Sequence, residues 1–192
     1  MKFFKQLTEP DLVKLLQAGA IGILPTDTVY GLVTWAADEV SVKRFYSLKD
    51  RHHKPGTVIA ASIDDLVELG IKRRYLKAVE QFWPGPLSVI VPPEPNLNYL
   101  HIGVDGLAVR VPANQELSQL LSKVGPLLTT SANAPGQPVA SSIKAARLYF
   151  KDSVDFYVDG GSLVNRQPST IIRIVDDAIE VIREGAVKLE DS

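Results

Sequence analysis

The sequence predicts an α/β fold that borders on α+β, with helices flanking an open, twisted, mixed β-sheet. Short apolar runs bounded by proline, glycine or polar residues are typical of buried strands, and they interleave with segments of helical periodicity. The two kinds of segment do not alternate as strict βαβ units, so we expect both parallel and antiparallel pairs. Hydrophobic residues make up 45% and charged residues 22% of the chain, which is typical of a globular protein.

Six segments have the apolar periodicity of helices. The first follows Thr8, which we expect to be its N-cap with Asp11 as the capping-box partner, and Gly19 fits its end. The other five predicted helices are residues 39–48, 64–69, 72–82, 115–122 and 143–149.

The predicted strands are short runs rich in β-branched and other apolar residues. They cover residues 20–24, 57–61, 87–91, 107–111, 127–130, 156–158, 170–175 and 180–183. No repeat, low-complexity tract or long linker divides the chain, and its 192 residues suit one core. We therefore expect a single domain over residues 1–192.

The composition excludes several functional classes. There is no cysteine, so the chain can form neither disulfides nor thiolate metal sites, and we expect a cytoplasmic protein. Glu9 and Asp11 come too early in the chain for a signal peptide. No run approaches the roughly 20 apolar residues that a membrane-spanning helix needs, so we expect no membrane contact.

Positive charge is concentrated in one region of a nearly neutral chain. Residues 43–77 carry nine basic and four acidic side chains, whereas the rest of the chain carries twelve basic and eighteen acidic ones. The net charge of −1 argues against a non-specific nucleic-acid coat. The local excess favours an anionic ligand at one place, although Lys72, Arg73 and Arg74 could equally serve to solvate a helix.

Two segments place polar or cationic groups next to predicted strands. PTDTVYGL at 25–32 follows a buried strand directly, where ligands bind in open α/β sheets. Its polar residues could instead cap a short helix. KDRHHKP at 49–55 holds Lys49, Arg51 and Lys54, and an extended backbone would point Lys49 and Arg51 the same way. These cations suit phosphates, and a solvated loop is the alternative.

The adjacent histidines of this basic segment do not predict a metal site. Neighbouring side chains on a strand face opposite ways, and the chain has one other histidine, His101. We therefore expect no metal ion held by the protein.

Arg110 is a lone arginine in the apolar run LAVRVP at 107–112. Alternation puts Leu107, Val109 and Val111 on one face of this strand and Arg110 on the other. A buried arginine needs an anionic partner. That partner is either a carboxylate of the protein or a carboxylate or phosphate of a ligand, and the strand pattern leaves both open.

A cluster of small polar side chains follows another predicted strand. Thr129, Ser131 and Asn133 lie in LTTSANAPG at 128–136, and small side chains let a ligand approach the backbone closely. The Gly-Lys-Ser/Thr core of a P-loop is absent, and a plain turn is the alternative. Near the end of the chain, Ser169 opens one strand and Arg183 closes another, which by themselves are weak indications of a site.

No arrangement of a nucleophile, a histidine and an acid stands out. The candidate groups are instead cations, hydroxyls and an amide. Such groups position an anion and stabilise developing negative charge, as nucleotidyl and phosphoryl transfer require.

Seven motifs in a fixed order resemble a known family. They are PTDTVYGL at 25–32, KDR with KP at 49–55, WPGPLSVIV at 83–91, LAVRVP at 107–112, TSAN with Gly136, PSTII at 168–172 and VIREGAV at 181–187. Together these motifs resemble the YrdC/TsaC family of threonylcarbamoyl-adenylate synthases, in its compact form. Each motif is modest, but the seven in this order are specific and span nearly the whole chain.

The resemblance implies a YrdC-like twisted sheet around a central, positively charged cavity. It implies a nucleotidyltransferase that converts L-threonine, bicarbonate and ATP, accompanied by magnesium, to threonylcarbamoyl-AMP and pyrophosphate. A separate threonylcarbamoyl transferase would use the product to modify the adenosine beside the anticodon of tRNA. No tightly bound cofactor is implied.

The resemblance also implies residue roles. Threonine would be bound by Thr28, Arg110 and Ser169. ATP would be bound by Lys49, Arg51, Lys54, Thr129, Ser131, Asn133 and Arg183. Lys49 and Arg51 would be catalytic, because they would neutralise charge on the leaving pyrophosphate while a carbamate oxygen attacks the α-phosphorus. No protein nucleophile is needed.

The chain departs from the family pattern at three places, one of which is Val139, where many members carry a serine or threonine. Many members carry a polar residue in the strand after KP, where this chain has the apolar residues Val58, Ile59 and Ala60. Pro135 stands before Gly136, where serine is common. These differences leave the choice among small amino acids open.

Two other functions remain alternatives. The chain could bind double-stranded RNA or tRNA without catalysis, although its net charge of −1 disfavours this as the main role. Carbamoyl transfer to another acceptor occurs in hydrogenase-maturation relatives. Those carry acylphosphatase-like and zinc-finger segments, which this chain does not have.

Overall fold

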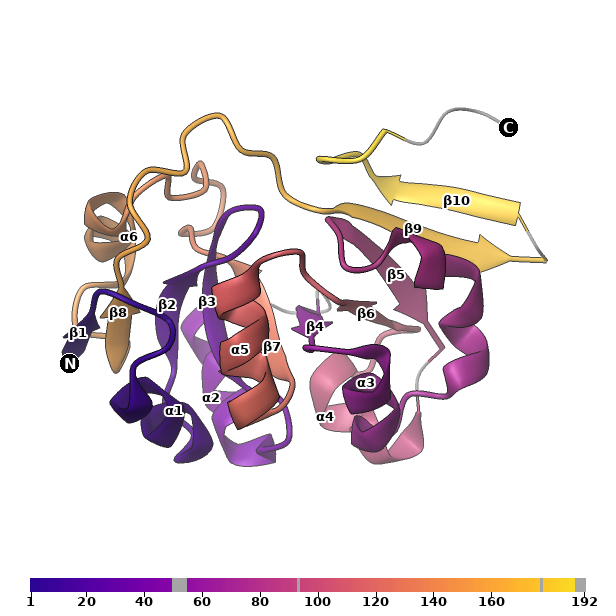
Figure 1. Cartoon of the computed structure of the whole chain (residues 1–192), viewed down its shortest axis with the longest axis horizontal. Coiled ribbons are helices and arrows are strands. Elements are labelled where there is room, and N and C mark those ends of the chain that lie inside the picture. The colour runs from indigo at the N-terminus through magenta and orange to yellow at the C-terminus, as the bar shows by residue number, and fades with distance from the viewer. Residues whose placement is uncertain (50–54, 93, 177, 189–192) are drawn as a thin grey trace.

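Ten strands form one sheet flanked by helices in the computed structural model, which describes residues 1–49, 55–92, 94–176 and 178–188 (Figure 1). The strands are β1 (Lys2–Phe4), β2 (Gly22–Pro25), β3 (Tyr30–Trp35), β4 (Thr57–Ile59), β5 (Leu87–Val91), β6 (Leu107–Arg110), β7 (Leu127–Ser131), β8 (Phe156–Val158), β9 (Thr170–Val175) and β10 (Ala178–Arg183). The helices are α1 (Pro10–Gln17), α2 (Glu39–Lys49), α3 (Ile63–Leu69), α4 (Asn98–His101), α5 (Gln115–Val124) and α6 (Ile143–Phe150).

The sheet is mixed, as the sequence predicts. Its strand order is β1-β8-β2-β3-β7-β4-β6-β5-β9-β10, so neighbours in space are mostly distant in sequence. Four pairs are parallel, namely β1–β8, β2–β8, β4–β6 and β5–β9. The other five are antiparallel. The prediction of a mixed α/β sheet is therefore confirmed.

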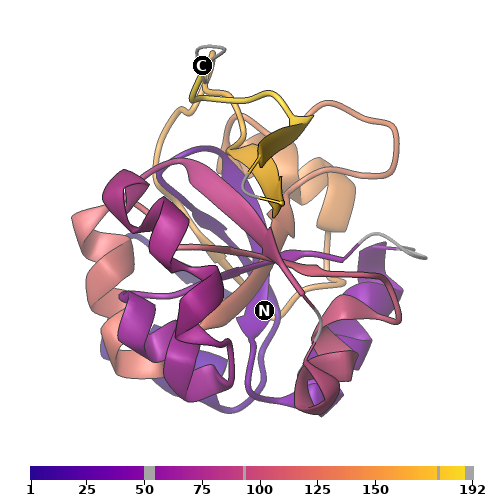
Figure 2. The same cartoon turned by 90° about the vertical axis from the view of Figure 1, so that its right-hand side faces the viewer.

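Helices cover both faces of the sheet (Figure 2). Successive residues of a strand point to opposite faces, and they enter two separate apolar clusters. Leu32 of β3 packs into the cluster that holds side chains of α2, α4 and α6. Its neighbour Val33 packs into the cluster that holds side chains of α1 and α5. No helix of the described residues is long and apolar enough to cross a membrane.

The start of α1 and the type of helix at residues 72–82 differ from the sequence-based expectation. The N-cap of α1 is Glu9 and not Thr8, and the Glu9 carboxylate accepts from the backbone N–H of Lys5 and Gln6. Residues 72–82 form two 3₁₀ turns, Arg73–Tyr75 and Lys77–Phe82, and not an α-helix. Leu76 and Val79 of this segment are both buried, and their spacing of three matches the 3₁₀ period.

Two strands and one short helix were not predicted. β1 is only three residues long, and α4 only four. β3 lies inside the motif PTDTVYGL, whose polar residues we interpreted as a loop or a helix cap. The structure contains no helix there, because residues 26–29 form the turn between the antiparallel strands β2 and β3. Thr26 closes this turn by donating from its hydroxyl to the Val29 carbonyl.

Tyr30 anchors the segment that crosses from β8 to β9. This segment passes over one end of the sheet in Figure 1. The buried Tyr30 hydroxyl donates to the Gly161 carbonyl at 2.8 Å and accepts from the Gly160 N–H at 2.9 Å. Burial raises the pKa of Tyr30, so the hydroxyl remains a donor. The motif tyrosine thus fixes the start of the segment that leads to Ser169.

Replacing Tyr30 by phenylalanine tests this anchor. We expect Tyr30→Phe to lower the free energy of unfolding by about 1–2 kcal/mol, because two hydrogen bonds are lost. Amide exchange should accelerate at Gly160. Tyr99→Phe is the matched control, because it removes one bond to the Ala36 carbonyl elsewhere in the fold. Equal exchange at Gly160 in both variants would contradict the anchoring role.

Candidate functional site

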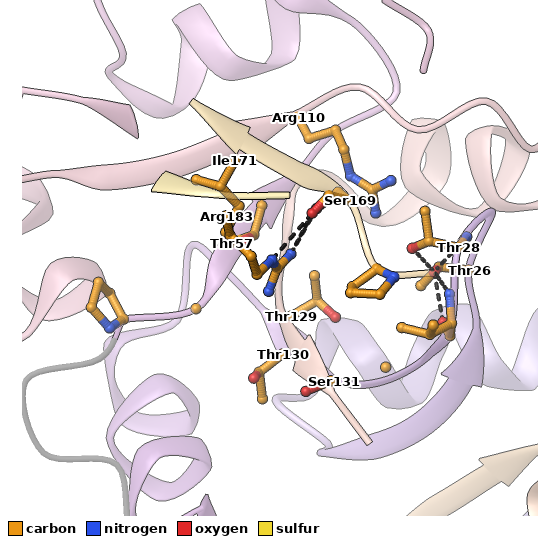
Figure 3. Close-up of a pocket in the computed structure, with 15 residues that line it drawn as sticks. Thr26, Thr28, Thr57, Arg110, Thr129, Thr130, Ser131, Ser169, Ile171 and Arg183 are labelled. Carbon is orange, nitrogen blue, oxygen red and sulfur yellow. Dashed lines mark hydrogen bonds between the residues drawn. The ribbon is translucent and has the colours of Figure 1, made fainter. Parts of the chain in front are cut away.

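A cavity of about 110 Å³ opens at one end of the central strands (Figure 3). Its lining combines two arginines with many hydroxyls, and the described lining residues include no carboxylate. The lining residues are Thr26, Thr28, Val29, Gly31, Pro55, Gly56, Thr57, Arg110, Thr129, Thr130, Ser131, Pro168, Ser169, Ile171 and Arg183. The prediction of a central, positively charged cavity agrees with this composition.

Strand register gathers these side chains on one face of the sheet. Thr57 pairs with Thr129, and Gly31 pairs with Ser131, so the members of each pair share a face. That face also carries Ile59, whose side chain packs into the cluster beneath α1 and α5. The same face is therefore apolar where these helices cover it and polar where they do not.

Two glycines allow the strands to approach closely at the cavity. A Cβ on Gly31 would lie 2.6 Å from the Thr129 hydroxyl, and one on Gly56 would lie 2.6 Å from the Thr129 carbonyl. Both distances are too short for a side chain. The glycines of the motifs VYGL and KPG thus have a packing role at the site.

Arg110 is buried and pairs with a carboxylate of the protein. Its Nη1 donates to both oxygens of Asp27, at 2.9 and 3.0 Å, and only 3% of Arg110 is exposed. Burial lowers the pKa of Arg110, and the Asp27 carboxylate opposes that effect. The Arg110 Nε is buried without a hydrogen-bond partner. The sequence left a protein partner and a ligand partner open, and the structure provides the protein partner.

Ser169 and Arg183 meet at the other wall of the cavity. The Arg183 guanidinium donates to the Ser169 carbonyl at 2.6 and 3.2 Å and to its hydroxyl at 3.2 Å (Figure 3). The Ser169 hydroxyl also lies 3.0 Å from the hydroxyl of Ser88 on β5. Ser169 and Arg183, which by themselves gave weak indications of a site in the sequence, are therefore direct neighbours.

Lys49 and Asn133 lie beside the cavity and connect to it through Ser131. The Lys49 ammonium donates to the Asn133 backbone carbonyl at 2.6 Å and to its side-chain oxygen at 3.0 Å. The Ser131 hydroxyl donates to the same side-chain oxygen at 2.8 Å. Lys49 is the last residue of α2, so its backbone is helical and not extended.

Six predicted site residues line one cavity and two lie next to it. The six are Thr28, Arg110, Thr129, Ser131, Ser169 and Arg183. Lys49 and Asn133 are the two neighbours. The predicted ATP ligands Arg51 and Lys54, and the histidine pair between them, lie outside the described residues. Among the residues the structure does describe, no group of three or more histidine, aspartate or glutamate side chains could hold a metal ion.

Sequence reasoning missed several residues of the site. Asp27 was not singled out among the polar residues of PTDTVYGL, although a buried arginine such as Arg110 needs an anionic partner. Ser88 is fully buried within the apolar run WPGPLSVIV, and a buried hydroxyl needs a partner. The apolar residues Val58, Ile59 and Ala60 are buried in the two cores, and Thr57 lines the cavity in their place.

Fold and site together define an open mixed-sheet α/β protein with a small, cationic, hydroxyl-lined cavity. The Sua5/YciO/YrdC family model, which carries the description "Telomere recombination", matches residues 14–185. A Pseudomonas syringae protein named threonylcarbamoyl-AMP synthase is 32% identical over 88% of this chain and 93% of its own. The chain belongs to the Sua5/YciO/YrdC family.

Solved structures share this fold. P. abyssi Sua5 complexed with L-threonine superposes with a TM-score of 0.83 at 27% identity. The match covers 96% of this chain but 57% of Sua5, so this chain spans little more than half of that protein. E. coli YciO has a TM-score of 0.83 at 23% identity, with 98% of both chains covered. At that identity YciO supports the fold alone.

Gly185 offers a test of how the end of the chain is held at the site. A Cβ there would lie 2.3 Å from the Pro168 carbonyl oxygen and 2.6 Å from the Ser169 carbonyl carbon. We expect Gly185→Ala to lower the melting temperature by about 3–10 °C, because backbone atoms must move apart. Ala186→Ser, at the exposed next residue, should change it little. Equal melting temperatures would mean that the close approach is not a constraint.

Proposed function

We propose that this chain is a threonylcarbamoyl-AMP synthase, which converts L-threonine, bicarbonate and ATP to threonylcarbamoyl-AMP and pyrophosphate. The main support is Arg110, a buried arginine that lines the cavity and whose Nε has no partner in the described part of the chain. Members of the family are named for this activity. The cavity holds anion-binding groups, and its described lining offers no carboxylate or histidine for acid–base catalysis.

Threonine fits the inner cavity in this proposal. Arg110 receives the threonine carboxylate, and Thr28 and Ser169 contact the remaining polar groups. A volume of about 110 Å³ suits a small amino acid. Sites for larger ligands generally measure about 300–1,000 Å³, so a nucleotide must extend beyond the cavity.

ATP lies at the mouth of the cavity in this proposal. The groups that would bind it are Lys49, Arg51, Lys54, Thr129, Ser131, Asn133 and Arg183. Lys49 and Asn133 lie beside the rim, where Ser131 joins them to the lining. The described cavity wall has no carboxylate, so magnesium would arrive on the ATP phosphates and be held chiefly by them.

In the proposed reaction, cations of the site stabilise the negative charge that develops on the leaving pyrophosphate. The threonine amine and bicarbonate give a carbamate and water, and a carbamate oxygen then attacks the α-phosphorus. The bond to the leaving pyrophosphate breaks, and negative charge grows on the leaving oxygen. Lys49 and Arg51 stabilise that charge, as fixed cations do in other phosphoryl and nucleotidyl transfers. No residue of the chain becomes covalently attached.

The cellular role extends this proposal. The adenylate would pass to a threonylcarbamoyl transferase complex that modifies tRNA beside the anticodon, in the cytoplasm. Residues 1–192 would act as one YrdC-like domain, because every described strand joins the same sheet. Direct binding of tRNA or double-stranded RNA is the competing function, and the product assay below separates the two.

Product detection tests the activity directly. Incubation with ATP, bicarbonate and L-threonine should yield threonylcarbamoyl-AMP by mass spectrometry, with pyrophosphate in equal amount. Omitting any one substrate should abolish both products. Pyrophosphate released from ATP alone, or no adenylate from the complete mixture, would overturn the proposal. Salt-sensitive tRNA binding in place of adenylate formation would favour the RNA-binding function.

Lys49 tests the placement of the phosphates. Lys49→Met keeps most of the side-chain volume and removes the charge, and we expect kcat/KM for ATP to fall about ten- to a hundredfold. Lys43→Met is the matched control, because Lys43 is exposed on the same helix and pairs with Glu39. It should stay within about twofold of the unchanged protein. Equal rates in the two variants would place the phosphates elsewhere.

A further inference from the structure

The Arg110–Asp27 pair leaves one complete edge of the guanidinium unused. Asp27 places both carboxylate oxygens on a single nitrogen, Nη1. The opposite edge of an arginine is formed by Nε and Nη2, whose N–H bonds point in parallel as a fork. Nε is buried without a partner, and no acceptor among the described residues contacts Nη2.

Asp27 is held by contacts with Arg110, with the Ala113 N–H and with the Arg166 side chain. One of its carboxylate oxygens accepts from the backbone N–H of Ala113 at 3.0 Å, and its backbone carbonyl accepts from Arg166 Nη1 at 3.2 Å. Its side chain is only 6% exposed. The carboxylate is therefore a fixed counter-charge in the turn between β2 and β3.

The guanidinium of Arg110 lies at the wall of the cavity. Arg110 lines the cavity, and in Figure 3 its guanidinium points towards the space between Ser169 and Thr28. A planar carboxylate matches the fork of two parallel N–H groups, whereas a neutral amide can accept there but brings no charge. A ligand carboxylate would thus place the guanidinium between two carboxylates, one from Asp27 and one from the ligand.

We propose that Asp27 is a positioning residue, which fixes the Arg110 guanidinium so that its free edge selects the carboxylate of the amino-acid substrate. This inference rests on the proposed function, because it takes the inner cavity as the amino-acid site. Asp27 does not touch the substrate in this arrangement. It acts through Arg110, by occupying Nη1 and turning the other edge towards the cavity.

Positioning and simple electrostatics predict opposite effects of removing Asp27. If Asp27 acted only by its charge, its removal would strengthen binding of an anion beside Arg110, because a like charge would be gone. If Asp27 positions Arg110, its removal weakens carboxylate binding, because the guanidinium loses its fixed orientation and asparagine brings a second donor towards Nη1 and Ala113 N–H. The direction of the change separates the two.

The experiment measures binding of L-threonine and of L-threoninamide by calorimetry. The unchanged protein should prefer threonine by about tenfold or more. Asp27→Asn should weaken threonine binding by about tenfold or more and alter threoninamide binding by less than about threefold. Asp64→Asn is the matched control, because it removes the carboxylate of the exposed Asp64–Arg73 pair outside the site, and both affinities should stay unchanged.

A second variant keeps the inference testable if Asp27→Asn fails to fold. Arg110→Lys keeps a cation for Asp27 but has no second edge, so it too should lose the preference for threonine over threoninamide. An unchanged or stronger threonine affinity in Asp27→Asn would overturn the positioning role. The positioning role would also be overturned if Arg110→Lys kept the full preference for threonine over threoninamide. It would likewise be overturned if the unchanged protein showed no such preference.

The outcomes for the activity and for Asp27 are distinguishable. A protein that binds threonine selectively but makes no adenylate would refute the proposed synthase activity and leave the binding comparison intact. An active synthase in which Asp27→Asn keeps the full preference for threonine would refute the role of Asp27 alone.

Discussion

The side chains of a β-strand alternate between the two faces of a sheet, and the site in this protein depends on that constraint. One face of the central strands is covered by α1 and α5 over part of its length and is left open beyond them. Where it is covered, residues such as Ile59 and Leu127 form a core. Where it is open, the same alternation presents Thr57 and Thr129 to the cavity. A shift of one residue in register would exchange core and site along a whole strand.

The buried charge at Arg110 imposes a second requirement. An arginine in this position demands a carboxylate, and the turn between β2 and β3 supplies Asp27. The pair joins β6 to a turn that lies about eighty residues earlier in the sequence. The cation therefore contributes to the assembly of the fold, and its Nε remains without a partner among the described residues of the protein. Under the proposed function, the same side chain would stabilise the fold and bind the substrate, and removing either partner of the pair would affect both.

The mixed sheet and most site residues could be predicted from sequence, because strand and helix periodicities are local and seven motifs occur in a specific order. Contacts between distant segments could not. Nothing local to Ser169 indicates Arg183, and nothing local to Ser88 indicates Ser169, since strand pairing brings them together. The 3₁₀ turns between Arg73 and Phe82 were mistaken for a helix, because a spacing of three fits both periods over a short segment. β3 was missed because its sequence overlaps a motif interpreted by its polar residues.

The position of β9 and β10 has a consequence for the order of folding. β9 pairs in parallel with β5, some eighty residues earlier, and the backbone of Val187 exchanges hydrogen bonds with the Thr170 hydroxyl. Such non-local pairings form late, because a long loop must close first. On a translating ribosome, the earlier strands can pair while Ser169 and Arg183 are still inside the exit tunnel. The cavity then lacks a wall until residues 169–187 have left the tunnel, so a nascent chain cannot hold its ligands before its sheet is complete.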